Sequence, residues 1–233
     1  MAAREKAVVL SSGGLNSAVL ASIASADFEP AMLHVRFDHR AAEKEHSLFT
    51  QQADFFEARH RQIVEMPHLA ALSTSARVNR KKQIEDVLAI AEQDNNCYIP
   101  GLVGSLVQAA ITWAAELNAT RIYLGVSENL GPPGPRTGGV FPDYAREHAQ
   151  LMQHLVEVAL PRRRVVLETP LIELSRSEII KLGRRLHSPF ELTWSCFSSG
   201  TEPCGGCLGC ATRNRGFLEA AAADPLMLQS AQH

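Results

Sequence analysis

The sequence lacks the features that mark several large classes of proteins. No stretch approaches the roughly 20 apolar residues that a membrane-spanning helix requires, and Met1 to Lys6 lead into a short strand-like run rather than a signal-peptide core. Basic charge is not in excess either, because 23 Lys and Arg stand against 25 Asp and Glu. We therefore expect a cytoplasmic protein with small-molecule or protein partners, no membrane attachment and no stable nucleic-acid complex.

Cysteine is scarce but clustered. Four of the five cysteines lie between Cys196 and Cys210, and in a reducing compartment this argues against a disulfide framework. The spacing C-x7-C-x2-C-x2-C lets consecutive thiolates converge on one ion, so the predicted metal ligands are Cys196, Cys204, Cys207 and Cys210. Four thiolates are typical of structural Zn²⁺, and an iron–sulfur cluster is the alternative. The isolated Cys97 is expected to be a small buried hydrophobe rather than a nucleophile.

The hydrophobic pattern alternates between strand-like and helix-like segments. Short apolar runs predict strands at residues 7–10, 30–37, 61–65, 121–126 and 165–168, and amphipathic stretches predict helices at residues 15–25, 41–59, 102–117, 143–160 and 175–186. Ser175 to Glu178 has the form of a capping box. Residues 67–96 show no clear pattern, and residues 130–142, with four prolines and four glycines, predict an irregular loop.

This alternation predicts an α/β fold with a parallel sheet flanked by helices, because each crossover returns over one face of the sheet. With 233 residues, of which 45% are hydrophobic, the chain can bury one substantial core. We expect residues 1–190 to form this domain and residues 191–233 to form a small metal-binding segment with a final helix. Ligands of such sheets bind at the carboxyl ends of the strands.

A glycine turn connects the first predicted strand to the first predicted helix. Ser12-Gly13-Gly14-Leu15-Asn16-Ser17 stands at this junction, where exposed backbone N–H groups and the helix dipole favour an anion. The hydroxyls of Ser12 and Ser17 can add donors, so the turn can hold a polyphosphate although it lacks the Gly-Lys-Ser/Thr ending of a Walker A loop. A glycine turn that only ends a strand is the alternative interpretation.

Several motifs are spread over nearly the whole chain. They are Ser12–Ser17, Glu168–Leu171, Glu191–Cys196, Pro203–Cys210, Arg213 and Gly216–Phe217. In order and spacing they resemble the 7-cyano-7-deazaguanine synthase family. The first of them also resembles the Ser-Gly-Gly-x-Asp-Ser signature of PP-loop ATP pyrophosphatases, which cleave ATP between its α and β phosphates and adenylate a substrate.

The resemblance implies an ATP-dependent carbon–nitrogen ligase of the PP-loop fold, usually a homodimer, that uses ATP, Mg²⁺ and Zn²⁺. In that family 7-carboxy-7-deazaguanine is adenylated, attacked by ammonia and converted through an amide to the nitrile precursor of queuosine. Carried onto this sequence, the catalytic residues are Ser12, Asn16 and Ser17. The nucleotide-binding residues are Ser11, Ser12, Gly13, Gly14, Leu15, Asn16, Ser17, Phe37 and Gly125, with the adenine expected near Val35 and Phe37.

The chain departs from the family pattern in its nucleotide and substrate motifs. Asn16 replaces the aspartate of the phosphate loop, which removes a charged ligand for Mg²⁺. Phe37-Asp38 continues as His39-Arg40 instead of Tyr-Gly-Gln-Arg-His, and Leu102-Val103 stands in place of an Arg-Asn pair. A second hypothesis is therefore a repurposed or catalytically weakened relative that binds nucleotide or deazaguanine, or conjugates a deazapurine to another molecule or protein. A third, tRNA thiolation, is disfavoured by the acidic balance.

Overall fold

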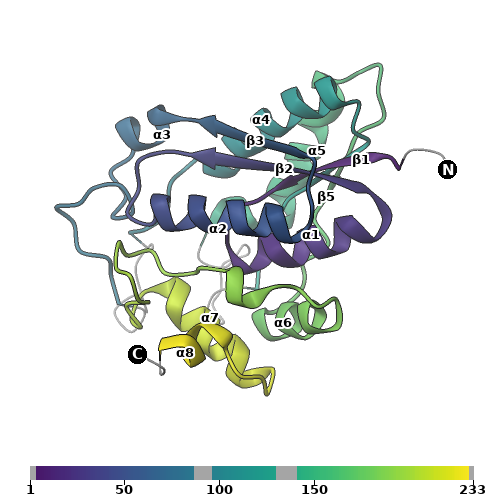
Figure 1. Cartoon of the computed structure of the whole chain (residues 1–233). Coiled ribbons are helices and arrows are strands. Elements are labelled where there is room, and N and C mark those ends of the chain that lie inside the picture. Colours follow the sequence, from purple (N-terminus) through teal and green to yellow (C-terminus); the bar gives the residue numbers. More distant parts are fainter. Residues whose placement is uncertain (1–3, 87–95, 130–140, 231–233) are drawn as a thin grey trace.

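A five-stranded parallel sheet forms the centre of the molecule. The computed structural model describes residues 4–86, 96–129 and 141–230 (Figure 1). Its strands lie in the order β3-β2-β1-β4-β5. Every pairing between neighbouring strands is parallel, which confirms the predicted fold class. The strands are β1 Lys6–Leu10, β2 Glu29–Arg36, β3 His60–Glu65, β4 Arg121–Tyr123 and β5 Val166–Glu168.

Helices cover both faces of this sheet. Helices α1 (Leu15–Asp27), α2 (Ala42–Phe55) and α6 (Arg176–Arg185) pack on one face, and α4 (Leu102–Leu117) and α5 (Arg146–Ala159) pack on the other (Figure 1). The chain adds β2 and β3 on one side of β1 and then β4 and β5 on the opposite side, so right-handed crossovers place α4 and α5 on the other face. The gap between β1 and β4 is therefore a topological switch point, where ligands of open α/β sheets bind.

Alternate residues of the central strand contribute to two separate cores. Ala7 and Val9 of β1 pack with α1 and α2, whereas Val8 and Leu10 pack with α4. None of the four is more than 6% exposed. Successive side chains of a strand point to opposite faces, and because both faces are covered here, the strand reads as a continuous apolar run.

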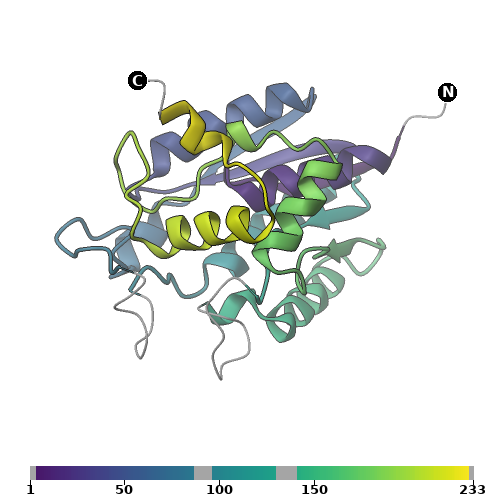
Figure 2. The same cartoon turned by 90° about the horizontal axis from the view of Figure 1, so that it is seen from below.

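The C-terminal residues form a helical segment against α6. Helices α7 (Leu208–Glu219) and α8 (Pro225–Ser230) lie on the side of the molecule seen from below in Figure 2. Inside this segment the buried Arg213 donates to both carboxylate oxygens of Asp224, at 2.7 and 2.8 Å, and to Thr193 Oγ1 at 2.8 Å. The bidentate ion pair with Asp224 fixes the position of the guanidinium, because its geometry is specific. Arg213 therefore connects Thr193, which precedes the cysteines, to Asp224, which follows them.

Most predicted elements are confirmed, with differences at their ends. The helix predicted from residue 143 begins at Arg146, because Pro142–Tyr144 form a short 3-10 helix that ends in extended backbone. The strand predicted over residues 121–126 ends at Tyr123. Helix α3 (Pro67–Leu72) was not predicted. The predicted loop at residues 130–142 lies, apart from its last two residues, outside the described residues. Within the described ranges no helix is long and apolar enough to cross a membrane.

Candidate active site at the switch point of the sheet

The predicted phosphate loop, Ser12–Ser17, follows Ser11 after the end of β1 and runs into the first turn of α1 at the switch point. Gly13 has a φ of 71°, and a Cβ atom added there would lie 2.5 Å from the backbone oxygen of Glu45. Both the left-handed conformation and this close contact require glycine. The loop therefore packs directly against the first turn of α2.

Buried polar side chains hold the start of this loop in place. Ser11 Oγ donates to Gln52 Oε1 at 3.2 Å, and His34 Nδ1 lies 2.9 Å from the backbone oxygen of Ser11. Burial lowers the pKa of His34 to about 4, so the ring is neutral at pH 7 and its Nδ1–H donates to that oxygen. Since buried polar groups without partners are costly, this network favours one conformation of the chain between β1 and α1.

Two adjoining cavities open at the loop. The first has a volume of about 200 Å³ and extends toward α6 and toward residues 191–233, called the cysteine segment below. The second has a volume of about 110 Å³ and extends over the carboxyl ends of β1, β2 and β4. The second is lined largely by apolar side chains, among them Leu33, Val35 and Leu124. Both cavities are lined by Ser12, Asn16, Gly125 and Tyr144, so the phosphate loop lies where they meet.

The structure brings most of the sequence-predicted site residues to these walls. Gly14 and Leu15 line the first cavity, Ser11 and Ser17 line the second, and Ser12, Asn16 and Gly125 line both. Ser17 Oγ donates to the backbone oxygen of Gly14 at 2.8 Å, which stabilises the turn itself. Gly13 lines neither cavity, because it faces α2.

Phe37 is not brought to either cavity wall. Its side chain is 5% exposed and packs with Val35, Leu69 and Ile99, and its ring centre lies 4.5 Å from that of His39. Val35, the other residue expected near the adenine, lines the second cavity. Phe37 therefore packs behind Val35 and does not line a cavity itself.

Arg176 is a site residue that the sequence did not single out. Its predicted role was in the capping box of α6, which the structure confirms: Ser175 Oγ accepts from Glu178 N, and Glu178 accepts from Ser175 N at 2.8 Å. The guanidinium of Arg176 also lines the first cavity and donates to Asn16 Oδ1. On the other side, Asn16 Nδ2 donates to the backbone oxygen of Gly125 at 2.7 Å. Asn16 therefore bridges α6 and the end of β4.

The charge of Arg176 is not balanced by a neighbouring acid. Within the described parts of the chain, no carboxylate forms an ion pair with Arg176, and its Nε is buried without a hydrogen-bond partner. Burial, and then the nearby Arg213, lower the pKa of Arg176 to about 10. A partly buried cation without a counter-charge is costly, so this end of the first cavity is suited to an anion.

A second charged group lies at the α2 side of the first cavity. Glu45 Oε1 lies 3.7 Å from Arg77 Nη2, and Glu45 Oε2 lies 3.5 Å from His39 Nε2. Burial raises the pKa of Glu45 to about 7, although Arg77 opposes the shift. Burial, with Arg77 adding to the effect, lowers the pKa of His39 to about 2, so that ring is neutral.

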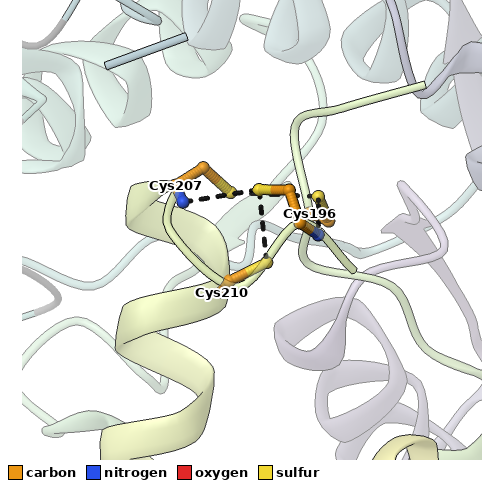
Figure 3. Close-up of side chains that lie close together, drawn as sticks. Cys196, Cys207 and Cys210 are labelled. Carbon is orange, nitrogen blue, oxygen red and sulfur yellow. Dashed lines mark hydrogen bonds between the residues drawn. The ribbon is translucent and has the colours of Figure 1, made fainter. Parts of the chain in front are cut away.

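The four clustered cysteines come together in space. Their ligand atoms all lie within 4.8 Å of one another, and the Sγ atoms of Cys196 and Cys207, and of Cys204 and Cys210, are 4.0 Å apart. Figure 3 shows the side chains of Cys196, Cys207 and Cys210 converging from α7 and from the loop beside it. Tetrahedral Zn–S bonds of about 2.3 Å place sulfurs about 3.8 Å apart, so the cluster fits such an ion. Hydrogen bonds from the neighbouring thiols hold the pKa of Cys207 well below its usual range.

The cysteine segment contacts the phosphate loop directly. The backbone N–H of Trp194 donates to Gly13 O at 3.0 Å, and Gln52 Nε2 donates to Leu192 O at 2.7 Å. Trp194 and Ser195 also line the first cavity, two and one residues before Cys196. A metal held by the cysteines would therefore stabilise part of the wall of the cavity.

Comparisons with known proteins identify the family. The model of the queuosine biosynthesis protein QueC family matches residues 6–221. This chain belongs to the QueC family. It is 33% identical over 227 residues to the 7-cyano-7-deazaguanine synthase of Acidobacterium capsulatum, covering 96% of both chains. The enzyme of that name from Chlorobium phaeobacteroides is 33% identical over 222 residues, covering 95% of this chain and 96% of its own.

A likeness to solved structures is weaker. The NMN synthetase of Francisella tularensis aligns over 95% of this chain and 79% of its own, with 11% identity and a TM-score of 0.47. That likeness carries no argument about function. The assignment to the QueC family rests on the sequence match, which spans both the phosphate loop and the four cysteines.

The residues of this QueC-family site fit the implied ligands unequally. The cysteine cluster fits Zn²⁺, and the unpaired Arg176 beside the glycine turn fits a polyphosphate. A protein site for Mg²⁺ fits less well, because that ion is usually held by one or two carboxylates together with substrate phosphates. Glu45 is the one carboxylate among the described lining residues, and Asn16 Oδ1 already accepts from Arg176.

Proposed function

We propose that this chain is an ATP-dependent ligase that adenylates a carboxylate, 7-carboxy-7-deazaguanine or a related acid, for attack by ammonia or another amine. The observation that carries the proposal is the meeting of two cavities at the phosphate loop. The apolar cavity over the strand ends suits a nucleoside, and the larger cavity suits the acid. Membership of the QueC family supports the same reaction class.

The arrangement allows the reaction to proceed by positioning and charge stabilisation. A carboxylate oxygen of the acid forms a bond to the α-phosphorus while the bond to pyrophosphate breaks, and the amine nitrogen then attacks the acyl carbon while AMP leaves. Ser12 and Asn16, which line both cavities, are placed for the first step, and Ser17 supports the turn. Arg176 can stabilise negative charge on the leaving pyrophosphate. ATP supplies the activation, so no side-chain nucleophile is required.

The other assignments form part of the same proposal. Residues 191–233 form a segment that holds one Zn²⁺ through the four cysteines, and residues 1–190 form the ATP-binding domain. The protein acts in the cytoplasm as a homodimer, on small-molecule substrates. Neither a membrane nor a stable nucleic-acid complex has a role.

One observation favours the second hypothesis, a catalytically weakened relative that binds nucleotide or conjugates a deazapurine. The guanidinium of Arg176 contacts Asn16 Oδ1, the position from which the family's aspartate offers a charged ligand to Mg²⁺. The guanidinium can still bind an anion, whereas the oxygen of Asn16 is less available as a ligand for Mg²⁺. The alternative predicts ATP binding without turnover.

The proposed reaction is tested by following its products. With ATP, Mg²⁺, ammonium and 7-carboxy-7-deazaguanine, we expect AMP and pyrophosphate to form in equal amounts, and only when the acid is present. A turnover on the order of 1 per second or slower lies at the lower end of the usual enzyme range. ATP binding measured by calorimetry without any AMP formation would favour the binding protein instead. Absence of both would contradict the two hypotheses together.

Asn16 offers a direct test of the missing charge. We expect Asn16→Asp to lower the Mg²⁺ concentration for half-maximal ATP cleavage by about tenfold, equivalent to about 1.4 kcal/mol, because a carboxylate binds this cation better than an amide. The gain is opposed by loss of the hydrogen bond to Gly125 O, since a carboxylate cannot donate. The measurement is pyrophosphate release over a Mg²⁺ titration, with Asn16→Ala as the variant that removes the amide without adding charge. Equal behaviour of the Asp and Ala variants would contradict the prediction.

A further inference from the structure

Glu45 is the one carboxylate among the described residues that line the two cavities. Its nearest cationic groups are Arg77 Nη2 at 3.7 Å and His39 Nε2 at 3.5 Å, whereas charge-assisted hydrogen bonds measure about 2.7–2.9 Å. The His39 ring is also neutral at pH 7. Both oxygens of a half-buried carboxylate therefore remain available to accept hydrogen bonds from a ligand.

The position of Glu45 is fixed relative to the phosphate loop. The residue lies in the first turn of α2, and its backbone oxygen would be 2.5 Å from a Cβ at Gly13. The loop and this turn cannot separate without losing that packing. A ring that binds Glu45 is therefore held at a set distance from the place where the two cavities meet.

The other walls suit a planar ring with polar edges. Trp194, Phe197, Phe141 and Tyr144 line the first cavity, and Trp194 Nε1 is buried without a hydrogen-bond partner. The Nε of Arg77 is likewise buried and unpartnered. Aromatic walls favour a flat ligand, and a carboxylate among them favours a ring whose edge carries hydrogen-bond donors.

We propose that Glu45 selects the acid of the reaction by accepting two hydrogen bonds from a ring N–H and an adjacent exocyclic amino group. Two parallel N–H donors match the two oxygens of a carboxylate, as in arginine–carboxylate pairs. Among the acids of the proposed reaction, those that carry a 2-amino-4-oxopyrimidine edge can make both contacts. This inference rests on the proposed function, because it places the acid in the first cavity. Ligands without the amino group leave one Glu45 oxygen unpaired.

The test compares two ligands on two proteins. Binding of 7-carboxy-7-deazaguanine and of its analogue without the 2-amino group is measured by calorimetry at pH 8, where Glu45 is ionised. The parent protein is expected to bind the amino compound about 10- to 100-fold more tightly, the range for loss of a hydrogen bond to a charged group. In Glu45→Gln, which keeps the size of the side chain, the ratio is expected to fall toward 1. The matched control is Glu43→Gln on the same helix, whose side chain is 81% exposed.

Each outcome decides the proposal. A parent protein that binds the two compounds equally, or binds neither, overturns it. So does a Glu45→Gln variant that weakens both compounds by the same factor, because that shows a structural role. A raised requirement for ammonium with unchanged discrimination would assign Glu45 to the amine instead. If binding discriminates between the two compounds through Glu45 but no AMP forms, this inference stands and the proposed reaction is contradicted.

Discussion

Replacing Cys207 by serine is expected to abolish metal binding and to lower the melting temperature by about 10 °C or more. Cys207 is 2% exposed and its Sγ lies 4.0 Å from that of Cys196, inside the four-sulfur cluster. Structural Zn²⁺ contributes roughly 10–16 kcal/mol in isolated zinc-finger peptides. Even a third of that, at about 2–4 °C per kcal/mol for a chain of this size, accounts for the expected fall.

The measurement is metal content per chain together with a thermal melt. The matched control is Cys97→Ala, because Cys97 is also 2% exposed but lies outside the cluster. Burial raises the pKa of the Cys97 thiol to about 12, which agrees with its predicted role as a buried hydrophobe. The control is expected to keep one metal ion per chain. Iron in the parent protein, or full metal content in Cys207→Ser, would contradict the prediction.

The same variant has an expected effect on ligand binding. Trp194 and Ser195 line the first cavity, and the Trp194 backbone donates to Gly13 O in the phosphate loop. Loss of the metal loosens the segment that carries them. At temperatures below the melting transition, the Cys207→Ser variant is therefore expected to bind ATP more weakly than the parent protein. This effect is indirect, because no cysteine lines either cavity.

Replacing Arg176 by glutamine is expected to weaken ATP binding by about 10- to 100-fold without lowering the stability of the protein alone. Hydrogen bonds to charged groups contribute about 1.5–3 kcal/mol, and the half-buried guanidinium has no carboxylate partner in the described chain. The lowered pKa of Arg176 means that burying its charge opposes folding. A neutral side chain removes that opposition, and glutamine keeps the methylene groups that pack beside Gly216.

The readout is the rise in melting temperature on adding ATP, which depends on the ratio of ligand concentration to Kd. Arg184→Gln serves as the control, because Arg184 is exposed in the last turn of the same helix. ATP is expected to protect that control as well as the parent. Full ATP protection of Arg176→Gln would place the polyphosphate elsewhere, and a large fall in its melting temperature without ATP would show a structural role for the charge.

Local patterns in the sequence were sufficient to predict the sheet, the phosphate loop and the cysteine cluster. Each of these depends on residues close together in the chain: an apolar run ending in Gly13-Gly14, or three cysteines within seven positions at the start of α7. Element ends were less predictable. Pro142–Tyr144 form a separate 3-10 helix before α5, and this depends on backbone conformation that hydrophobic periodicity does not specify.

The composition of the site depended on contacts between distant segments. Arg176 and Asn16 are 160 positions apart and Trp194 is about as far from Gly13, yet both pairs form hydrogen bonds. In sequence, Arg176 is the second residue of a capping box and Glu45 is one acid among several on α2. Local signals cannot assign a cavity to either residue, because the cavity exists only where β1, β4, α2, α6 and the cysteine segment meet. The sequence by itself determined the fold class and marked the glycine turn and the four thiols as candidate binding groups, and the tertiary structure decided which charges line the cavities, because desolvation and pairing arise only on packing.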